Sequence, residues 1–228
     1  MANCCATRLG RGHIEKGPEM KLLVAGATGL VGSHVLTLAL DSAEVDQVVA
    51  LTRRPLPPHP KLLCVPVDFE KLPADADWWR VDAVICALGT TIRKAGSPQA
   101  FERVDHDYPL MIADHAKRAG ASIYVLNSAI GADPDSRLLY NRTKGRVERD
   151  LQAMEFRSLT LVRPGLIGGE RDEFRPAERI AAILLGIAAP VLPRRWRINP
   201  AENIARALVT AALGGEAGVH IIQSQELV

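Results

Sequence analysis

The stretch that decides the fold is Lys21-Leu-Leu-Val-Ala-Gly-Ala-Thr-Gly-Leu-Val-Gly-Ser-His-Val-Leu36. It predicts a short buried strand over 22–25, a tight glycine turn, and a helix that begins near Leu30. The glycines permit positive φ, a close approach of the backbone to a phosphate, and close packing of helix on strand. The turn therefore predicts an anion site at a helix N-terminus, where unpaired N–H groups face the ligand. Its candidate contact residues are Gly26, Thr28, Gly29, Leu30, Val31 and Gly32.

The glycine spacing is Gly-x-x-Gly-x-x-Gly, not the Gly-x-Gly-x-x-Gly of the commonest dinucleotide-binding turn. A purely structural strand-to-helix turn is the alternative interpretation. The flanking strand and helix favour the binding interpretation, because the motif requires that context.

The composition is that of an ordinary globular chain. It has 228 residues, of which 47% are hydrophobic and 24% charged, and this suits one α/β domain over 20–228. A formal net charge of +2 without a basic run gives no indication of a nucleic-acid partner. No apolar run reaches the roughly 18 residues that a membrane span needs. We therefore expect a small-molecule substrate and no membrane role, and a protein partner or a homodimer stays open.

Residues 1–19 are polar and have no apolar segment of the secretory type, so we expect a disordered extension or a leader. Cys4 and Cys5 lie in this part of the chain. Cys64 and Cys86 fall in predicted buried strands without a second metal-ligand pair nearby, so we expect reduced core thiols and no metal site. Reduced thiols predict a cytoplasmic location.

Strand and helix patterns alternate through most of the chain. This alternation predicts an α/β fold, a Rossmann-like doubly wound parallel sheet with helices on both faces, in a single domain. We expect further strands at 47–53, 62–68, 122–128, 157–163 and 219–222, and a strand followed by a glycine turn within 82–91. We expect helices at 30–40, 99–118, 139–154, about 176–188 and 201–213, with a loop over 91–98 and a kink or break at Pro109. A small C-terminal segment, the arginine-rich stretch 170–197, is expected to cover the substrate.

The ends of the predicted strands supply more candidate contacts. In a doubly wound sheet an acidic residue after the second strand binds the ribose 2′-hydroxyl of NAD, whereas arginine accommodates the 2′-phosphate of NADP. Arg53 and Arg54 stand there, and they favour NADP(H); two solvated arginines are the alternative. Asp68 after the third strand is a candidate near an adenine ring. Leu88, Gly89 and Thr90 follow the fourth strand, which flanks the cofactor crevice in such sheets.

Ser128, Tyr140 and Lys144 are the candidate catalytic residues. Tyr140 and Lys144 are four positions apart, so a helix places them on one face. A phenol with a pKa of about 10 is a poor base at neutral pH, and a neighbouring ammonium stabilises its phenolate. Ser128 at the end of the adjacent strand can donate a hydrogen bond to the same substrate oxygen. A surface tyrosine and a solvated lysine are the alternative interpretation.

Several segments together resemble a known family. They are Gly26-Ala-Thr-Gly-Leu-Val-Gly32, Leu88-Gly-Thr-Thr91 with Lys94-Ala-Gly96, Val104-Asp-His-Asp-Tyr108, Tyr140 with Lys144-Gly-Arg-Val-Glu148, and Arg163-Pro-Gly165. The chain resembles the short-chain dehydrogenase/reductase superfamily over about residues 20–222. More narrowly it is similar to the atypical, Tat-interacting-protein-like branch and its bacterial epimerase-like relatives.

This resemblance implies a Rossmann-like fold that binds NADP(H). It implies that Tyr140 is the acid/base, that Lys144 binds the nicotinamide ribose, and that Ser128 orients the substrate oxygen. It also implies that Pro164 and Gly165 back the nicotinamide. Asp105 stands where many members carry an asparagine, which puts the usual proton relay through that residue in doubt.

The function we expect is an NADP-dependent oxidoreductase that transfers hydride to or from a small carbonyl or alcohol, with Tyr140 as acid/base. Two alternatives stay open. One is a sugar-nucleotide epimerase or dehydratase, and the other is a non-catalytic, NADP(H)-sensing regulatory protein.

Overall fold

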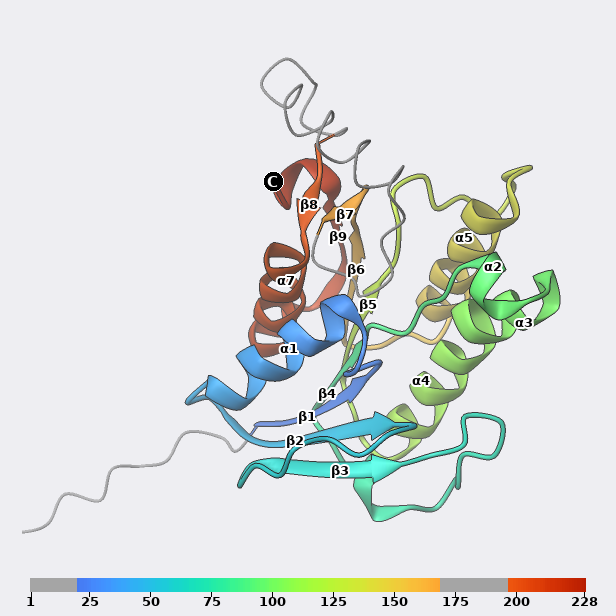
Figure 1. Ribbon diagram of the computed structural model, residues 1–228. Helices are drawn as coiled ribbons and strands as arrows, with labels where there is room; N and C mark the ends of the chain where they lie inside the picture. The colour runs from blue at the N-terminus through green and yellow to red at the C-terminus, as the bar shows by residue number, and fades with distance from the viewer. Residues whose placement is uncertain (1–19, 169–196) are drawn as a thin grey trace, which may run out of the picture.

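A computed structural model describes residues 20–168 and 197–228. Its centre is a seven-stranded sheet of order β3-β2-β1-β4-β5-β6-β9 (Figure 1), in which every neighbouring pair is parallel. The strands are β1 (Met20–Ala25), β2 (Val45–Thr52), β3 (Leu62–Pro66), β4 (Ala83–Cys86), β5 (Ile123–Asn127), β6 (Ser158–Arg163) and β9 (Gly218–Gln223). The predicted doubly wound, Rossmann-like sheet in a single domain is confirmed.

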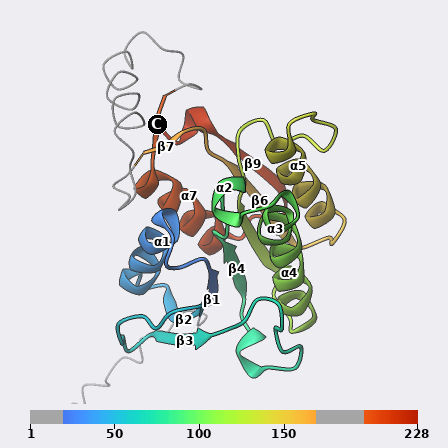
Figure 2. The ribbon, with the colours of Figure 1, turned by 45° about the vertical axis from the view of Figure 1, so that its right-hand side comes forward.

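Helices cover both faces of this sheet. Figures 1 and 2 show α1 (Leu30–Asp41) beside α7 (Ala201–Gly214) on one face, and α4 (Tyr108–Arg118) with α5 (Leu139–Gln152) on the other. Two separate apolar cores result, one under each pair of helices. The inner strands are apolar in an unbroken run because both of their faces are buried. The shorter elements are α2 (Ile92–Ala95), α3 (Pro98–Glu102), the 3₁₀ turns Asp77–Trp79 and Ser224–Glu226, and a small sheet of β7 (Ile167–Gly168) with β8 (Asn199–Pro200).

The predicted helix over 99–118 is divided in three. Between α3 and α4 the chain forms a π-helix over Arg103–Asp107, in which the N–H of Tyr108 donates to the carbonyl of Arg103. Pro109, in the first turn of α4, explains the break, because proline has no N–H to donate to the carbonyl four residues back. The helix predicted over 99–118 is therefore interrupted at 103–107, just before Pro109, rather than at Pro109 itself.

One predicted loop needs correction, and two predicted segments lie outside the described residues. The loop predicted over 91–98 contains the helical turn α2. Residues 1–19 and nearly all of the stretch 170–197 lie outside the described residues. In the part of the chain that the structure describes, no helix is long and apolar enough to cross a membrane. Cys86 is a buried free thiol, and Cys64 is free and half-buried.

The turn between β1 and α1 is packed backbone to backbone. A Cβ at Gly32 would overlap the carbonyl oxygen of Gly26 and lie 2.7 Å from its carbonyl carbon. Gly26 itself has φ +88°, and a Cβ there would lie 2.7 Å from the carbonyl of Ala87, just after β4. These two glycines therefore bring α1 onto β1, and the turn onto the segment after β4.

We expect Gly32→Ala to lower the free energy of unfolding by about 3 kcal/mol, because the backbone of Gly26 has no room to yield. Urea unfolding measures this as a lower midpoint at an unchanged slope. The matched control is Gly214→Ala at the end of α7, where nothing lies within 4 Å of the added Cβ. This change should leave stability equal or raise it by up to about 1 kcal/mol. Equal stability of the two variants would show that the close approach at Gly32 is not a constraint.

Candidate functional site

The N-terminus of α1 is an open anion cradle. Its N-cap residue Gly29 makes no side-chain capping bond, and the first turn has no acidic residue. The amide of Gly29 donates to the carbonyl of Gly26 at 3.0 Å, so the chain curls back before the helix begins. The N–H groups of Leu30, Val31 and Gly32 precede the first helical hydrogen bond and lack a partner within the helix. Such a terminus, without a Cβ on Gly29, fits a phosphate group.

The other predicted cofactor contacts follow the strands next to β1. Arg53 and Arg54 are exposed directly after β2, where Thr52 Oγ1 donates to the carbonyl of Arg54 at 2.7 Å. Asp68 is exposed after β3, and its Oδ1 accepts a hydrogen bond from the Glu70 amide at 3.0 Å. These side chains therefore lie at the carboxyl edge of the sheet, where doubly wound folds bind their ligands.

The segment after β4 is held by a hydrogen bond to the π-helix. Leu88 is partly buried and Gly89 is exposed, and Thr28 on the glycine turn is exposed as well. The amide of Thr90 donates to Asp105 Oδ2 at 2.8 Å. The sequence did not predict this bond, which joins two segments far apart along the chain.

One face of α5 carries the predicted acid/base and two buried charges. Tyr140, Lys144 and Glu148 follow one another at intervals of four residues, about one turn each. Tyr140 is 40% exposed, and its ring centroid lies 5.8 Å from that of Phe101 on α3. Lys144 and Glu148 are both buried. The structure therefore brings Tyr140 and Lys144 onto one face, as predicted, with the phenol toward solvent.

Lys144 is paired with a carboxylate rather than solvated. Its Nζ lies 2.8 Å from Asp105 Oδ1, and the two side chains are 4% and 1% exposed. Burial alone lowers the pKa of Lys144, but the Asp105 carboxylate and the Tyr140 phenol together outweigh burial, so that this pKa is raised. The ammonium is therefore charged and held in place.

Ser128 is engaged by a second buried carboxylate. Its Oγ donates to Glu148 Oε1 at 2.5 Å, and Glu148 in turn accepts from Arg163 Nε at 3.0 Å. The hydrogen bond to Glu148 raises the pKa of Arg163 against the opposing effect of burial. Ser128 therefore lies buried beside α5, and its hydroxyl hydrogen is directed at Glu148 rather than at the site where a substrate oxygen was expected.

Pro164 and Gly165 follow β6 and are fixed by a side chain from β8. Asn199 is fully buried, and its Oδ1 accepts hydrogen bonds from the Gly165 amide at 2.7 Å and from Ser224 Oγ at 2.8 Å. The carbonyl of Pro164 accepts from the Ile130 amide at 2.8 Å. This turn is therefore tied both to the chain after β5 and to the C-terminal segment.

Two of these supporting residues, Glu148 and Asn199, are not among the predicted site residues. Glu148 could have been found, because it continues the four-residue spacing of Tyr140 and Lys144. Asn199 carries no comparable signal, since its partners lie 34 and 25 residues away along the chain.

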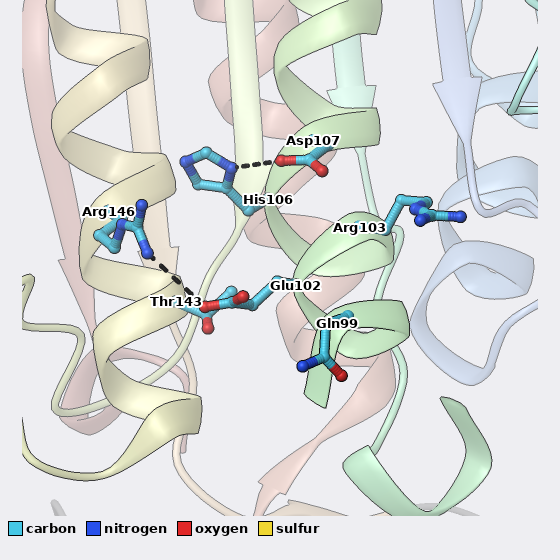
Figure 3. A pocket seen from close by; sticks show the side chains of 7 residues that line it. All are labelled: Gln99, Glu102, Arg103, His106, Asp107, Thr143 and Arg146. Carbon is cyan, nitrogen blue, oxygen red and sulfur yellow. Dashed lines mark hydrogen bonds and ion pairs between the residues drawn. The ribbon is translucent and has the colours of Figure 1, made fainter. Parts of the chain in front are cut away.

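A polar pocket of about 240 Å³ lies between the α3–α4 segment and α5 (Figure 3). Within it Arg146 pairs with Glu102 at 3.6 Å and His106 with Asp107 at 2.7 Å. No predicted catalytic or cofactor residue is among the side chains that line it: Gln99, Glu102, Arg103, His106, Asp107, Thr143 and Arg146. The pocket is therefore separate from the candidate site.

Comparison with known proteins identifies the family of this chain and corrects one expectation. A family model described as NAD(P)H-binding matches residues 26–176, more than half of the chain. A protein named fmp52, mitochondrial, from Emericella nidulans is 36% identical over 205 residues, which cover 84% of this chain and 88% of that protein. The expectation of a cytoplasmic location is wrong in the light of this relative, which is named mitochondrial. Reduced cysteines are consistent with any reducing compartment and do not identify one.

Two further comparisons identify the branch and the fold. Protein HTATIP2 from Rattus norvegicus is 34% identical over 202 residues, which cover 85% of this chain and 81% of that protein. The solved structure of MoeE5 in complex with UDP-glucose and NAD superposes with a TM-score of 0.67 at 20% identity, over 88% of this chain and 74% of that one, so it shows a shared fold. The chain therefore belongs to the NAD(P)H-binding, atypical short-chain dehydrogenase/reductases, in the Tat-interacting-protein-like branch.

Proposed function

We propose that this protein is an NADP(H)-dependent oxidoreductase that interconverts a small carbonyl compound and its alcohol, with Tyr140 as acid/base. The observation that carries the proposal is the arrangement on α5, where a half-exposed phenol stands one turn from a buried ammonium. That arrangement suits a group that must exchange a proton with a bound substrate. A nicotinamide dinucleotide supplies or accepts the hydride when bound.

Residues of the chain would hold the cofactor and transfer the proton. The α1 N-terminus would hold the pyrophosphate through the N–H groups of Leu30, Val31 and Gly32, and Pro164 with Gly165 would contact the nicotinamide. In reduction, Tyr140 donates its phenolic proton to the carbonyl oxygen as the carbonyl carbon receives the hydride. In oxidation, the Tyr140 phenolate takes the hydroxyl proton as hydride leaves the carbon. Lys144 favours the phenolate by its charge.

The preference for NADP(H) rests on Arg53 and Arg54. Both are exposed after β2, and no carboxylate ends that strand to accept a ribose hydroxyl. A guanidinium matches a phosphate group by charge and by its fork of N–H donors. Bound at the carboxyl edge, the 2′-phosphate would meet these two side chains.

A second candidate function is an NAD(P)(H)-sensing protein without turnover. One observation favours it, namely that the Ser128 hydrogen is donated to Glu148 and so is not offered to a substrate oxygen. The half-exposed Tyr140 beside Lys144 favours the enzyme instead, because cofactor binding alone requires no proton donor. The effect of removing the Tyr140 hydroxyl separates the two functions.

We expect Tyr140→Phe to lower carbonyl reduction by about 100-fold or more, the range that general acid catalysis contributes. NADPH affinity, measured by fluorescence titration, should stay as in the unmodified protein, because the ring remains. Tyr108→Phe is the matched control for turnover, since that hydroxyl donates to Glu70 at 2.6 Å and is not among the proposed catalytic groups. If aldehydes, ketones and quinones all give no turnover while NADPH binds tightly, the sensing function replaces the enzyme.

We expect Arg53→Ala to weaken NADPH binding at least about tenfold and to leave NADH binding nearly unchanged, because a hydrogen bond between charged groups contributes about 1.5–3 kcal/mol. The dissociation constants of both cofactors measure this. Arg118→Ala removes an exposed arginine at the end of α4 and controls for net charge. Equal weakening of NADPH and NADH would refute the 2′-phosphate assignment.

A further inference from the structure

We propose that Asp105 is a positioning residue of the Tyr140–Lys144 pair: its carboxylate fixes the ammonium and offsets part of the positive charge that reaches the phenol. The inference rests on the proposed function, because it concerns proton exchange by Tyr140. It predicts that removal of the Asp105 charge lets phenolate form at lower pH.

The geometry leaves the carboxylate one orientation. Asp105 Oδ1 lies 2.8 Å from Lys144 Nζ, and Oδ2 accepts the Thr90 amide at 2.8 Å. The side chain is 1% exposed, and the ion pair at one oxygen and the hydrogen bond at the other both hold it. The ammonium at the other end of the pair is therefore held at a defined place on α5.

The charge of Asp105 opposes that of Lys144 at the phenol. Tyr140 interacts electrostatically with Lys144, one turn away on α5, and the Asp105 carboxylate lies 2.8 Å from the same ammonium. Lys144 and Asp105 are buried and so are screened less than surface charges, and we expect the loss of one of the two charges to shift the titration of Tyr140 by about one pH unit. The phenol therefore experiences an ion pair rather than a free cation.

The other groups around the pair do not mimic this effect. Among the described residues, the Cys86 thiol on β4 also faces Lys144, and burial raises the pKa of that thiol, so it stays neutral. Phe101, which packs on Tyr140 from α3, is apolar. Glu148, one turn beyond Lys144, is neutralised by Arg163. Asp105 is thus the anion whose removal changes the charge at the Tyr140–Lys144 pair.

Two roles for Asp105 predict opposite results. If its charge matters, Asp105→Asn keeps the shape but exposes the phenol to the full ammonium charge, and phenolate forms at lower pH. If Asp105 is only an anchor, its loss lets Lys144 move away from Tyr140, and phenolate forms at higher pH. The sign of the change therefore distinguishes the roles.

The experiment is a spectrophotometric phenolate titration of the unliganded protein, with the spectrum of Tyr140→Phe subtracted so that Tyr140 alone contributes. The sequence has three tyrosines. Burial and the Glu70 hydrogen bond raise the pKa of Tyr108 to about 12, and burial raises the pKa of Tyr124 well above its usual value. We expect the Tyr140 midpoint to fall by about one pH unit in Asp105→Asn. The half-maximum of the alcohol-oxidation rate, which requires phenolate, should fall with it.

The matched control is Asp107→Asn, the same substitution two residues away on the same π-helix. Figure 3 shows that the Asp107 carboxylate points toward His106, 2.7 Å away, and its side chain is 60% exposed. This variant should leave the Tyr140 midpoint in place. An unchanged or higher midpoint in Asp105→Asn, or an equal fall in both variants, would overturn the proposal.

A buried ammonium without its partner is costly, so Asp105→Asn could fail to fold. In that case Asp105→Ser, which leaves room for a water beside Lys144, repeats the titration with the same expected sign. The titration needs neither cofactor nor substrate. A lowered midpoint without turnover on any carbonyl would therefore uphold the role of Asp105 while refuting the proposed oxidoreductase, whereas turnover with an unmoved midpoint would do the reverse.

Discussion

The site depends on one steric constraint, the contact between backbones at the first glycine turn. Because Gly32 has no side chain, α1 can pack against the carbonyl of Gly26. Because Gly26 has none, the chain after β4 can pack against it at Ala87. Three residues beyond Ala87, the Thr90 amide is bonded to Asp105, and Asp105 is paired with Lys144. A continuous set of contacts therefore runs from the anion cradle to α5. A Cβ at either glycine would overlap neighbouring backbone atoms and so displace this set of contacts.

The π-helix is the irregular element that this chain of contacts requires. In a regular α-helix the carbonyl of Asp105 would meet the ring of Pro109, which can donate no hydrogen bond to it. The wider π turn relieves that conflict and adds a residue to the turn that faces α5. Asp105 is thereby buried against Lys144, while its neighbours His106 and Asp107 face the polar pocket. Pro109 thus explains both the break in the helix and the direction in which the Asp105 side chain faces.

Local patterns predicted most of the fold and only part of the site. The strand, turn and helix over 22–40 and the shared face of Tyr140 and Lys144 depend on neighbours within a few residues, so spacing alone reveals them. The partners of those residues could not be predicted in this way. Asp105 lies far from Lys144 along the chain, and Asn199 reaches Gly165 from another sheet. Such pairs depend on topology, which determines what each buried polar group meets.

The buried groups on α5 also limit how a substrate oxygen can be held. Glu148 accepts hydrogen bonds from the Ser128 hydroxyl and from two N–H groups of Arg163. Loss of these bonds would leave a buried carboxylate with fewer partners, which is unfavourable. A carbonyl oxygen can only accept hydrogen bonds, so in this arrangement Ser128 offers it a lone pair and no proton. Ser128 is bonded to Glu148 and Lys144 is paired with Asp105, whereas the Tyr140 hydroxyl has no hydrogen-bond partner among the described residues. The geometry of proton transfer in the proposed reaction therefore depends on the single phenol and on the ammonium that adjusts it, rather than on two donors acting together.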